Sequence, residues 1–393
     1  MDLHKALADV EDYIIAHRRY LHQHPETSFK EVETTKYIAA ELDKLGVAYD
    51  IPTEEPKTGV IAYIDGTKEG PKKAVALRAD IDALNVTEAT DLDFKSQNVG
   101  AMHACGHDAH AAMLLGAAKV LSEHKEAFPG RVYLIFQPAE EVGTGAEYMM
   151  RQGTWFDEIE SIYGSHVWNN LEVGKINVEA GPRMAAADWF TIKIHGKSGH
   201  GSQPHETIDA VLVGAEVVNA LQQLTARNYN AFDPCTVVVG RFESGNRFNI
   251  IAGEAELEGT NRYFSREISD RIEGDFHRVV KGICDAYGAT YDMDYNHIII
   301  PTINWEHETD IARGALTKVA GDEAFKSQEK VTGGEDFSYY LEKKPGVFAF
   351  VGTYNPEKGC DAPHHNEHFN VDESALKNGA GMYVQYAIDA LNQ

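Results

Sequence analysis

The stretch 102–110 (MHACGHDAH) combines a thiol, three imidazoles and a carboxylate. Cys105 and His107 stand one residue apart, so their side chains can point to the same side of an extended segment. Thiolate and imidazole are both ligands for a borderline-soft divalent ion such as zinc. The apolar helical pattern that begins at Ala109 places them where a loop enters a buried helix. For this stretch alone, a helix start capped by Asp108 is the alternative to a metal site.

Three further polar segments each follow an expected buried strand, and they include Asp80, the adjacent pair Glu140 and Glu141, and His166. The strands are expected at 74–77, 131–136 and 159–163. Polar groups at the carboxyl ends of successive strands converge at one edge of an open α/β sheet. Adjacent glutamates at a strand end are often only solvated charges. Beside a metal site, one could bind the ion while the other acts as a general base.

A histidine-rich segment near the end of the chain adds a further candidate ligand, at His364, His365 or His368. Five ligands drawn from cysteine, histidine and glutamate exceed the four of a structural tetrahedral zinc site. Such a set suits two ions that share a bridging ligand and lie about 3.5–4 Å apart. The residues alone therefore favour a two-metal centre.

The length of 393 residues favours two domains. Within residues 184–298 the expected order of elements is β-α-β-β-α-β, which is the ferredoxin-like arrangement. We therefore expect an α/β fold in which this α+β domain is inserted into a first domain made of residues 1–183 and 299–393.

The composition limits the partners and the compartment. The 36 Lys and Arg residues against 61 Asp and Glu residues give a net charge of −25, which disfavours nucleic acid and anionic membranes as partners. The four cysteines form no CxxC pair, so a disulfide framework is not expected and a cytoplasmic location is the default. The N-terminal segment lacks the apolar core of a signal peptide, and no stretch is apolar enough to span a membrane.

These motifs resemble those of the two-metal amidohydrolases that include carboxypeptidase G, the aminoacylases and succinyl-diaminopimelate desuccinylase. The similarity is greatest to the branch of hippurate hydrolase and the indole-acetyl-amino-acid hydrolases, and it runs over essentially the whole chain. It rests on His17-Arg18, Leu21-His22, His24-Pro25-Glu26, Arg78-Ala79-Asp80, His103 to His110, Gln137 to Glu141, Gly199-His200, Glu335-Asp336-Phe337 and Pro363-His364-His365.

The resemblance implies two divalent ions, manganese or zinc, held by five side chains. Cys105 would bridge the ions, at a position where most of the wider family has aspartate. His107 and His166 would complete one ion, and Glu141 and His365 would complete the other. The resemblance also implies a zinc-peptidase-like catalytic domain, a mixed sheet flanked by helices, with the inserted domain serving as a lid and a dimerisation surface.

Further roles follow from the same resemblance. Glu140 would be the general base, and His200 would bind the scissile carbonyl or its oxyanion. Asp80 would orient a metal ligand without binding the ion itself. Arg78 stands where the wider family has a metal-binding histidine, a loss for which His166 would compensate.

Asn249 and Arg262 match residues that hold the carboxylate region of the substrate. Two nearby positions depart from the usual motifs. Ala252 replaces the proline of Asn-Val-Ile-Pro, and Asn261 replaces the valine of Gly-Thr-Val-Arg. These departures leave the metal chemistry intact and bear on substrate preference.

The activity expected from the resemblance is hydrolysis of the amide bond of N-acyl amino acids or similar small conjugates, by a homodimer. A dipeptidase or carboxypeptidase acting on short peptides with the same machinery is the alternative. An inactive binding protein is disfavoured because all five ligands and Glu140 are present. A hydrolase that uses Cys105 as a nucleophile would leave His166, His365 and the paired glutamates without a role.

Overall fold

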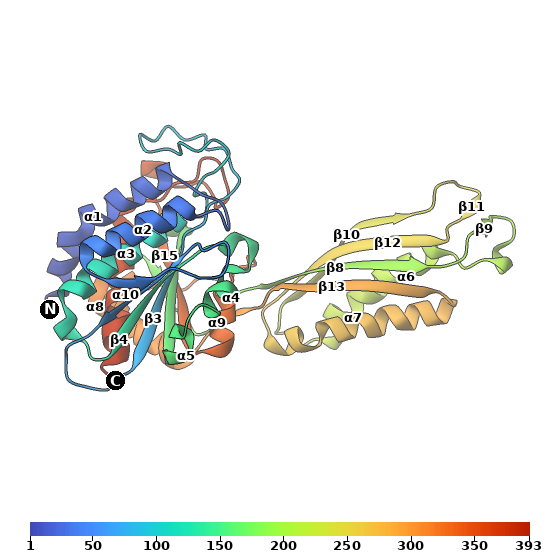
Figure 1. The fold of residues 1–393 in the computed structure, drawn as a ribbon. Helices are drawn as coiled ribbons and strands as arrows, with labels where there is room; N and C mark the ends of the chain where they lie inside the picture. Colours follow the sequence, from blue (N-terminus) through green and yellow to red (C-terminus); the bar gives the residue numbers. More distant parts are fainter. The chain divides into compact units, whose positions relative to one another are not determined.

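The computed structural model describes residues 1–393 and divides them into two compact units (Figure 1). Unit 1 comprises Met1–Gly181, Ile303–Glu329 and Tyr339–Gln393, and unit 2 comprises Pro182–Thr302 and Lys330–Ser338. The segment Lys330–Ser338, expected in the first domain, thus groups with the inserted region. The reason is local pairing, because Val331 forms a parallel bridge with Met184 and its N–H donates to the carbonyl of Arg183 at 2.8 Å.

Unit 1 is built on a mixed seven-stranded sheet in the order β1-β2-β4-β3-β5-β15-β6. The central pairs β4/β3, β3/β5 and β5/β15 are parallel, and the outer pairs are antiparallel. The sheet confirms the α/β class. Its strands are β1 (Ala48–Asp50), β2 (Val60–Asp65), β3 (Ala74–Asp80), β4 (Arg131–Gln137), β5 (Ser161–Glu172), β6 (Ile176–Asn177) and β15 (Gly346–Tyr354).

The strand β5 is longer than the sequence pattern predicts. It was expected to end near Tyr163, with His166 in the segment after it, but it continues to Glu172. The extension is paired in parallel with β15, where Phe350 lies opposite His166. Because that partner lies far along the chain, the local pattern of residues 159–163 cannot reveal it. His166 is therefore held within a strand rather than in a loop.

The helix α3 (His107–Glu123) lies at the centre of unit 1 and packs against α1, α10 and β3 (Figure 1). Its residues from His107 to Ala118 are all buried, as expected for a helix that is apolar on every side. The other helices are α1 (Leu3–Gln23), α2 (Val32–Leu45), α4 (Gly145–Met150), α5 (Trp155–Glu158), α8 (Glu306–Ala320), α9 (Ser338–Lys343) and α10 (Leu376–Leu391). None of the helices in the structure combines the length and the apolar character that crossing a membrane requires.

Unit 2 contains a four-stranded antiparallel sheet in the order β10-β12-β8-β13, with α6 and α7 on one face (Figure 1). Phe190, Ile192 and Ile194 alternate along β8 and bury their side chains in the apolar core of this unit. The elements are β8 (Ala186–His195), β9 (Gly199–His200), α6 (Ala210–Gln223), β10 (Cys235–Ser244), β11 (Ile250–Ile251), β12 (Glu254–Tyr263), α7 (Arg266–Tyr287) and β13 (Thr290–Ile299). Two more short strands are β7 (Gly181–Met184) and β14 (Thr302–Asn304).

Candidate metal centre

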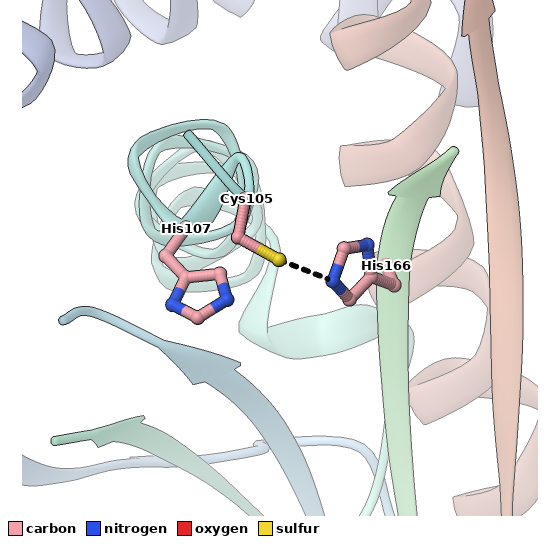
Figure 2. Close-up of side chains that lie close together, drawn as sticks. All are labelled: Cys105, His107 and His166. Carbon is pink, nitrogen blue, oxygen red and sulfur yellow. Dashed lines mark hydrogen bonds between the residues drawn. The ribbon is translucent and has the colours of Figure 1, made fainter. Parts of the chain in front are cut away.

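The start of α3 and the middle of β5 bring a cysteine and two histidines together in the interior of unit 1 (Figure 2). Cys105 Sγ lies 3.3 Å from His166 Nε2, and one ligand atom from each of Cys105, His107 and His166 lies within 4.8 Å of the others. All three residues are buried. Gly106 makes this corner possible with a φ of 96°, because a Cβ there would lie 2.3 Å from Val167 Cγ2.

A second group of ligand atoms shares Cys105 with the first. Cys105, Glu141 and His365 also offer atoms within 4.8 Å of one another. His365 Nε2 lies 3.6 Å from Glu141 Oε1, and His107 Nε2 lies 3.8 Å from the same oxygen. The backbone holds His365 in place, since its N–H donates to the carbonyl of Ala104 at 2.8 Å. The five side chains predicted as ligands are thus adjacent, with Cys105 common to both groups.

The two buried histidines are oriented by hydrogen bonds at Nδ1, which leaves Nε2 turned toward the cluster. His107 Nδ1 lies 3.1 Å from Asp82 Oδ1, and its Nε2 is buried without a hydrogen-bond partner. His166 Nδ1–H donates to the carbonyl of Val167 at 2.5 Å, and its Nε2 faces Cys105. A histidine that donates from one nitrogen and offers the lone pair of the other is prepared to bind a metal ion.

The charges of the cluster are poorly compensated by the protein alone. Burial and the nearby carboxylates raise the pKa of the Cys105 thiol well above its usual range. Burial, opposed by His107, raises the pKa of Glu141 to about 7, and Glu141 Oε1 is buried without a hydrogen-bond partner. A divalent cation would reverse both shifts. The sulfur, nitrogen and oxygen donors and the unpaired buried atoms therefore fit a metal centre.

Glu140 and Glu141 both reach this cluster from the turn that follows β4. The turn begins at Ala139, whose φ of 57° is unusual for a residue other than glycine. Glu31 stabilises it, because its Oε1 accepts the N–H of Ala139 at 2.9 Å. Glu140 Oε2 lies 4.0 Å from His107 Nε2, on a side chain that is 9% exposed. Glu140 therefore lies beside the ligand group of His107 and Glu141.

Comparison with known proteins places this arrangement in a family. The model of peptidase family M20/M25/M40 matches residues 76–389. The chain belongs to this family. It is 41% identical to thermostable carboxypeptidase 1 of Saccharolobus solfataricus, with 98% of the chain and 97% of the relative covered, and 40% identical to N-acyl-L-amino acid amidohydrolase of Geobacillus stearothermophilus, with 78% and 81% covered. It also matches a solved Bacillus subtilis structure described as a dinuclear metal binding peptidase from the M20 family, with a TM-score of 0.84, 34% identity and coverage of 98% and 99%.

In this M20 protein, the carboxylate nearest to His107 is that of Asp82 and not that of Asp80, the residue predicted from the sequence. Asp82 contacts His107 Nδ1 and also accepts from Ser28 Oγ at 2.7 Å and from the N–H of Glu141 at 3.1 Å. Asp80, which was expected to orient a ligand, lies 3.8 Å from His107 Nδ1 and makes a shorter contact of 2.6 Å with His110 Nδ1. The signal was the two-residue spacing of Asp80 and Asp82, which puts both side chains on one side of an extended segment.

The three C-terminal histidines have different surroundings. His365 reaches Glu141, whereas His364 stacks on Trp168 with ring centroids 4.7 Å apart and accepts the N–H of Asn169 at Nε2. Burial lowers the pKa of His364 to about 3. His368 is exposed. Of the three, His365 is the one placed to bind a metal ion with Cys105 and Glu141.

The remaining candidates lie in unit 2, where a small sheet brings two of them together. His200 of β9 pairs with Ile250 of β11, which directly follows Asn249. The N–H of Ser202 donates to His200 Nδ1 at 3.1 Å, so the proton of a neutral His200 is on Nε2. Arg262 lies on β12, where its Nη1 donates to the Thr260 hydroxyl and to the carbonyl of Asn261.

Asn261, one of the departures from the family motif, does not share a face of β12 with Arg262. Its side chain is fully buried within unit 2, and Nδ2 donates to the Tyr295 hydroxyl at 2.7 Å. Tyr295 in turn donates to the buried Asp188 at 2.6 Å. The polar substitution therefore serves an internal hydrogen-bond network of unit 2 rather than a direct contact with a ligand.

Proposed function

We propose that this M20 enzyme hydrolyses the amide bond of N-acyl amino acids or similar small conjugates with the help of two divalent metal ions. The observation that carries the proposal is the pair of buried histidines, His107 and His166, beside a cysteine shared by two groups of ligand atoms. His166 Nε2 lies 3.3 Å from Cys105 Sγ, and His107 Nε2 is buried without a hydrogen-bond partner. The name of the Geobacillus relative, an N-acyl-L-amino acid amidohydrolase, supports this substrate class. The name of the Saccharolobus relative, a carboxypeptidase, keeps short peptides as the alternative.

Cys105, His107 and His166 would hold one ion, and Cys105, Glu141 and His365 would hold the other. When bound, the ions supply Lewis acidity that polarises the amide carbonyl and makes water a better nucleophile. Zinc and manganese are the candidates, because thiolate favours zinc whereas carboxylate tolerates manganese.

The proton transfers are assigned to Glu140. One oxygen of its carboxylate takes a proton from the water that attacks the amide carbon, and it later gives that proton to the leaving nitrogen as the C–N bond breaks. His200 donates its Nε2–H to the carbonyl oxygen as negative charge develops there. Asn249 and Arg262 bind the carboxylate of the amino-acid part. Asp82 orients His107 through its Nδ1, and Asp80 lies 3.8 Å from the same nitrogen.

A homodimer with unit 2 as the lid and dimerisation domain forms part of the proposal. Unit 2 exposes several large apolar side chains, namely Val211, Leu212, Phe242, Phe248 and Ile250. Val211, Phe248 and Ile250 line one hollow together with Gly201, the residue after His200. A second copy of the chain would cover this surface and receive His200 in its active site. A cytoplasmic location agrees with the four free cysteines.

A substrate screen tests the proposed activity. The metal-loaded enzyme is assayed with N-acetyl, N-benzoyl and indole-acetyl amino acids and, in parallel, with free dipeptides and carboxypeptidase substrates, using manganese and zinc in turn. Higher kcat/KM for an N-acyl amino acid supports the proposal, and higher kcat/KM for peptides favours the alternative.

Complementation tests the dimer. Glu140→Gln and His200→Ala are each expected to be nearly inactive, and a co-refolded equal mixture is expected to recover roughly a quarter of wild-type activity, because half of the dimers then contain one intact composite site. No recovery, with subunit exchange confirmed by different tags, would show that His200 serves its own chain.

A further inference from the structure

The first turn of α3 carries another buried histidine, His110, to which the proposed chemistry assigns no role. Its Nδ1 lies 2.6 Å from Asp80 Oδ1, and its Nε2 accepts the backbone N–H of Val167 at 2.8 Å. Because Nε2 accepts a hydrogen bond, the proton of the ring is on Nδ1 and is donated to Asp80. Both nitrogens are therefore engaged. His110 has no lone pair to offer an ion, although its ring centroid is only 4.5 Å from that of His166.

The contact with Val167 occurs where β5 loses a neighbouring strand. β3 and β5 pair in parallel only as far as Arg78 opposite Gly164. Beyond that point the N–H of Val167 is satisfied by the imidazole of His110 rather than by a strand. An unpaired buried N–H is unfavourable, so this bond fixes the backbone of β5 where the sheet alone does not.

The same residue, Val167, also orients the ligand His166. The carbonyl of Val167 accepts Nδ1–H of His166 at 2.5 Å, and this contact leaves Nε2 directed at Cys105 Sγ (Figure 2). Val167 is thus held at its N–H by His110 and holds His166 with its carbonyl.

The other side of His110 is anchored as firmly. Asp80 Oδ2 accepts from Arg78 Nη1 at 2.7 Å, and Arg78 Nε donates to Gln137 Oε1 at 2.8 Å. Arg78, Asp80, His110 and Gln137 are all fully buried. Buried charges of this kind are tolerated only with their partners in place, so the arrangement leaves His110 little freedom to move.

We propose that His110 is a positioning residue, which holds Val167 so that His166 keeps its Nε2 aimed at the metal centre. The inference rests on the proposed function, because it requires that His166 bind an ion. It assigns to Arg78 and Asp80 a role in holding His110 rather than in touching the ions.

A pair of amide variants separates the two bonds of His110. Asparagine matches the Nδ1 position, so His110→Asn keeps a donor for Asp80 and loses the acceptor for Val167. Glutamine matches the Nε2 position, so His110→Gln keeps the acceptor. Tyr386→Phe is the matched control, because it removes a buried hydrogen bond of 3.1 Å to Ser161, at the beginning of the same strand.

The measurement is stepwise removal of metal from the loaded proteins by a chelator of known affinity, followed by elemental analysis and thermal unfolding. We expect His110→Asn to lower the affinity for one of the two ions by about 10–100-fold and to leave the affinity for the other ion unchanged. His110→Gln should lose less affinity, and Tyr386→Phe should lower only the unfolding temperature. Wild-type affinity for both ions in His110→Asn, or equal weakening by all three variants, would overturn the inference.

A measurement on the wild-type protein keeps the inference testable if the variants fold poorly. Nitrogen NMR of histidine-labelled, metal-loaded protein should show the proton of His110 on Nδ1, and a proton on Nε2 would overturn the inference. If the wild-type protein binds two ions and His110→Asn binds them equally well, only this inference is refuted. Wild-type protein that binds no ion would refute the proposed function itself.

Discussion

Replacing each of the paired glutamates by glutamine tests the two roles assigned at the end of β4. Glu140→Gln keeps the side chain almost the same shape but removes its ability to take up a proton. Glu140 Oε2 lies 4.0 Å from His107 Nε2, whereas Glu141 Oε1 lies within 3.8 Å of both His107 Nε2 and His365 Nε2. We therefore expect Glu140→Gln to keep two ions and Glu141→Gln to lose metal affinity.

The expected magnitudes differ in kind. Loss of general base catalysis should reduce kcat of Glu140→Gln by about 10²–10⁴-fold, which corresponds to about 3–5 kcal/mol in the barrier. Burial raises the pKa of Glu141 to about 7 in the metal-free protein, and a bound cation would favour its charged form. A neutral glutamine lacks the negative charge that attracts the cation. Glu141→Gln should therefore weaken metal binding by at least about 10–100-fold, the loss that is typical when a residue that orients a metal ligand is changed.

The assay combines elemental analysis after gel filtration with steady-state kinetics at saturating metal. Glu147→Gln, which changes an exposed glutamate on α4, serves as the control and should behave as the wild type. The reasoning would be refuted if Glu140→Gln lost an ion while Glu141→Gln kept both and lost only kcat.

Three further predictions concern other residues of unit 1. Cys105 should resist alkylation in the metal-loaded enzyme and react after chelation, and equal rates followed by mass spectrometry would count against ligation. Gly106→Ala should destabilise the protein by at least about 1–2 kcal/mol in chemical denaturation and reduce its metal content, because of the φ of 96° and the contact with Val167. Burial, with Asp82 nearby, raises the pKa of Glu31 to about 8. The stability of the wild type should therefore decrease as the pH rises from about 4.5 to 8, because this carboxyl ionises in the unfolded chain but stays protonated in the folded protein. Glu31→Gln should flatten that part of the pH profile, and an unchanged slope would contradict the assignment.

Much of the fold of unit 1 could be predicted from local patterns. The amphipathic spacing of residues 3–20 and 30–46 predicts α1 and α2, and short apolar runs predict β3 and β4. The full length of β5 could not be predicted, because its second half depends on pairing with β15, a strand that lies far along the chain. The grouping of Lys330–Ser338 with unit 2 depends on a similar distant contact, between Val331 and Met184.

The candidate site divides in the same way. Residue types with metal affinity are visible in the sequence, and the structure brings Cys105, His107, Glu141, His166 and His365 together. The sequence does not show which group orients which ligand, because an aspartate or a buried histidine has many uses. Asp82 and His110 acquire their roles only through contacts with His107 Nδ1 and the N–H of Val167, which are set by the packing of α3 against the sheet.

The metal content of the purified protein, measured together with its turnover, tests the central claim most directly. The proposed centre predicts two manganese or zinc ions per chain, loss of hydrolysis of N-acyl amino acids on chelation, and recovery when either metal is added back. Full turnover by protein that elemental analysis shows to be free of metal would contradict the account.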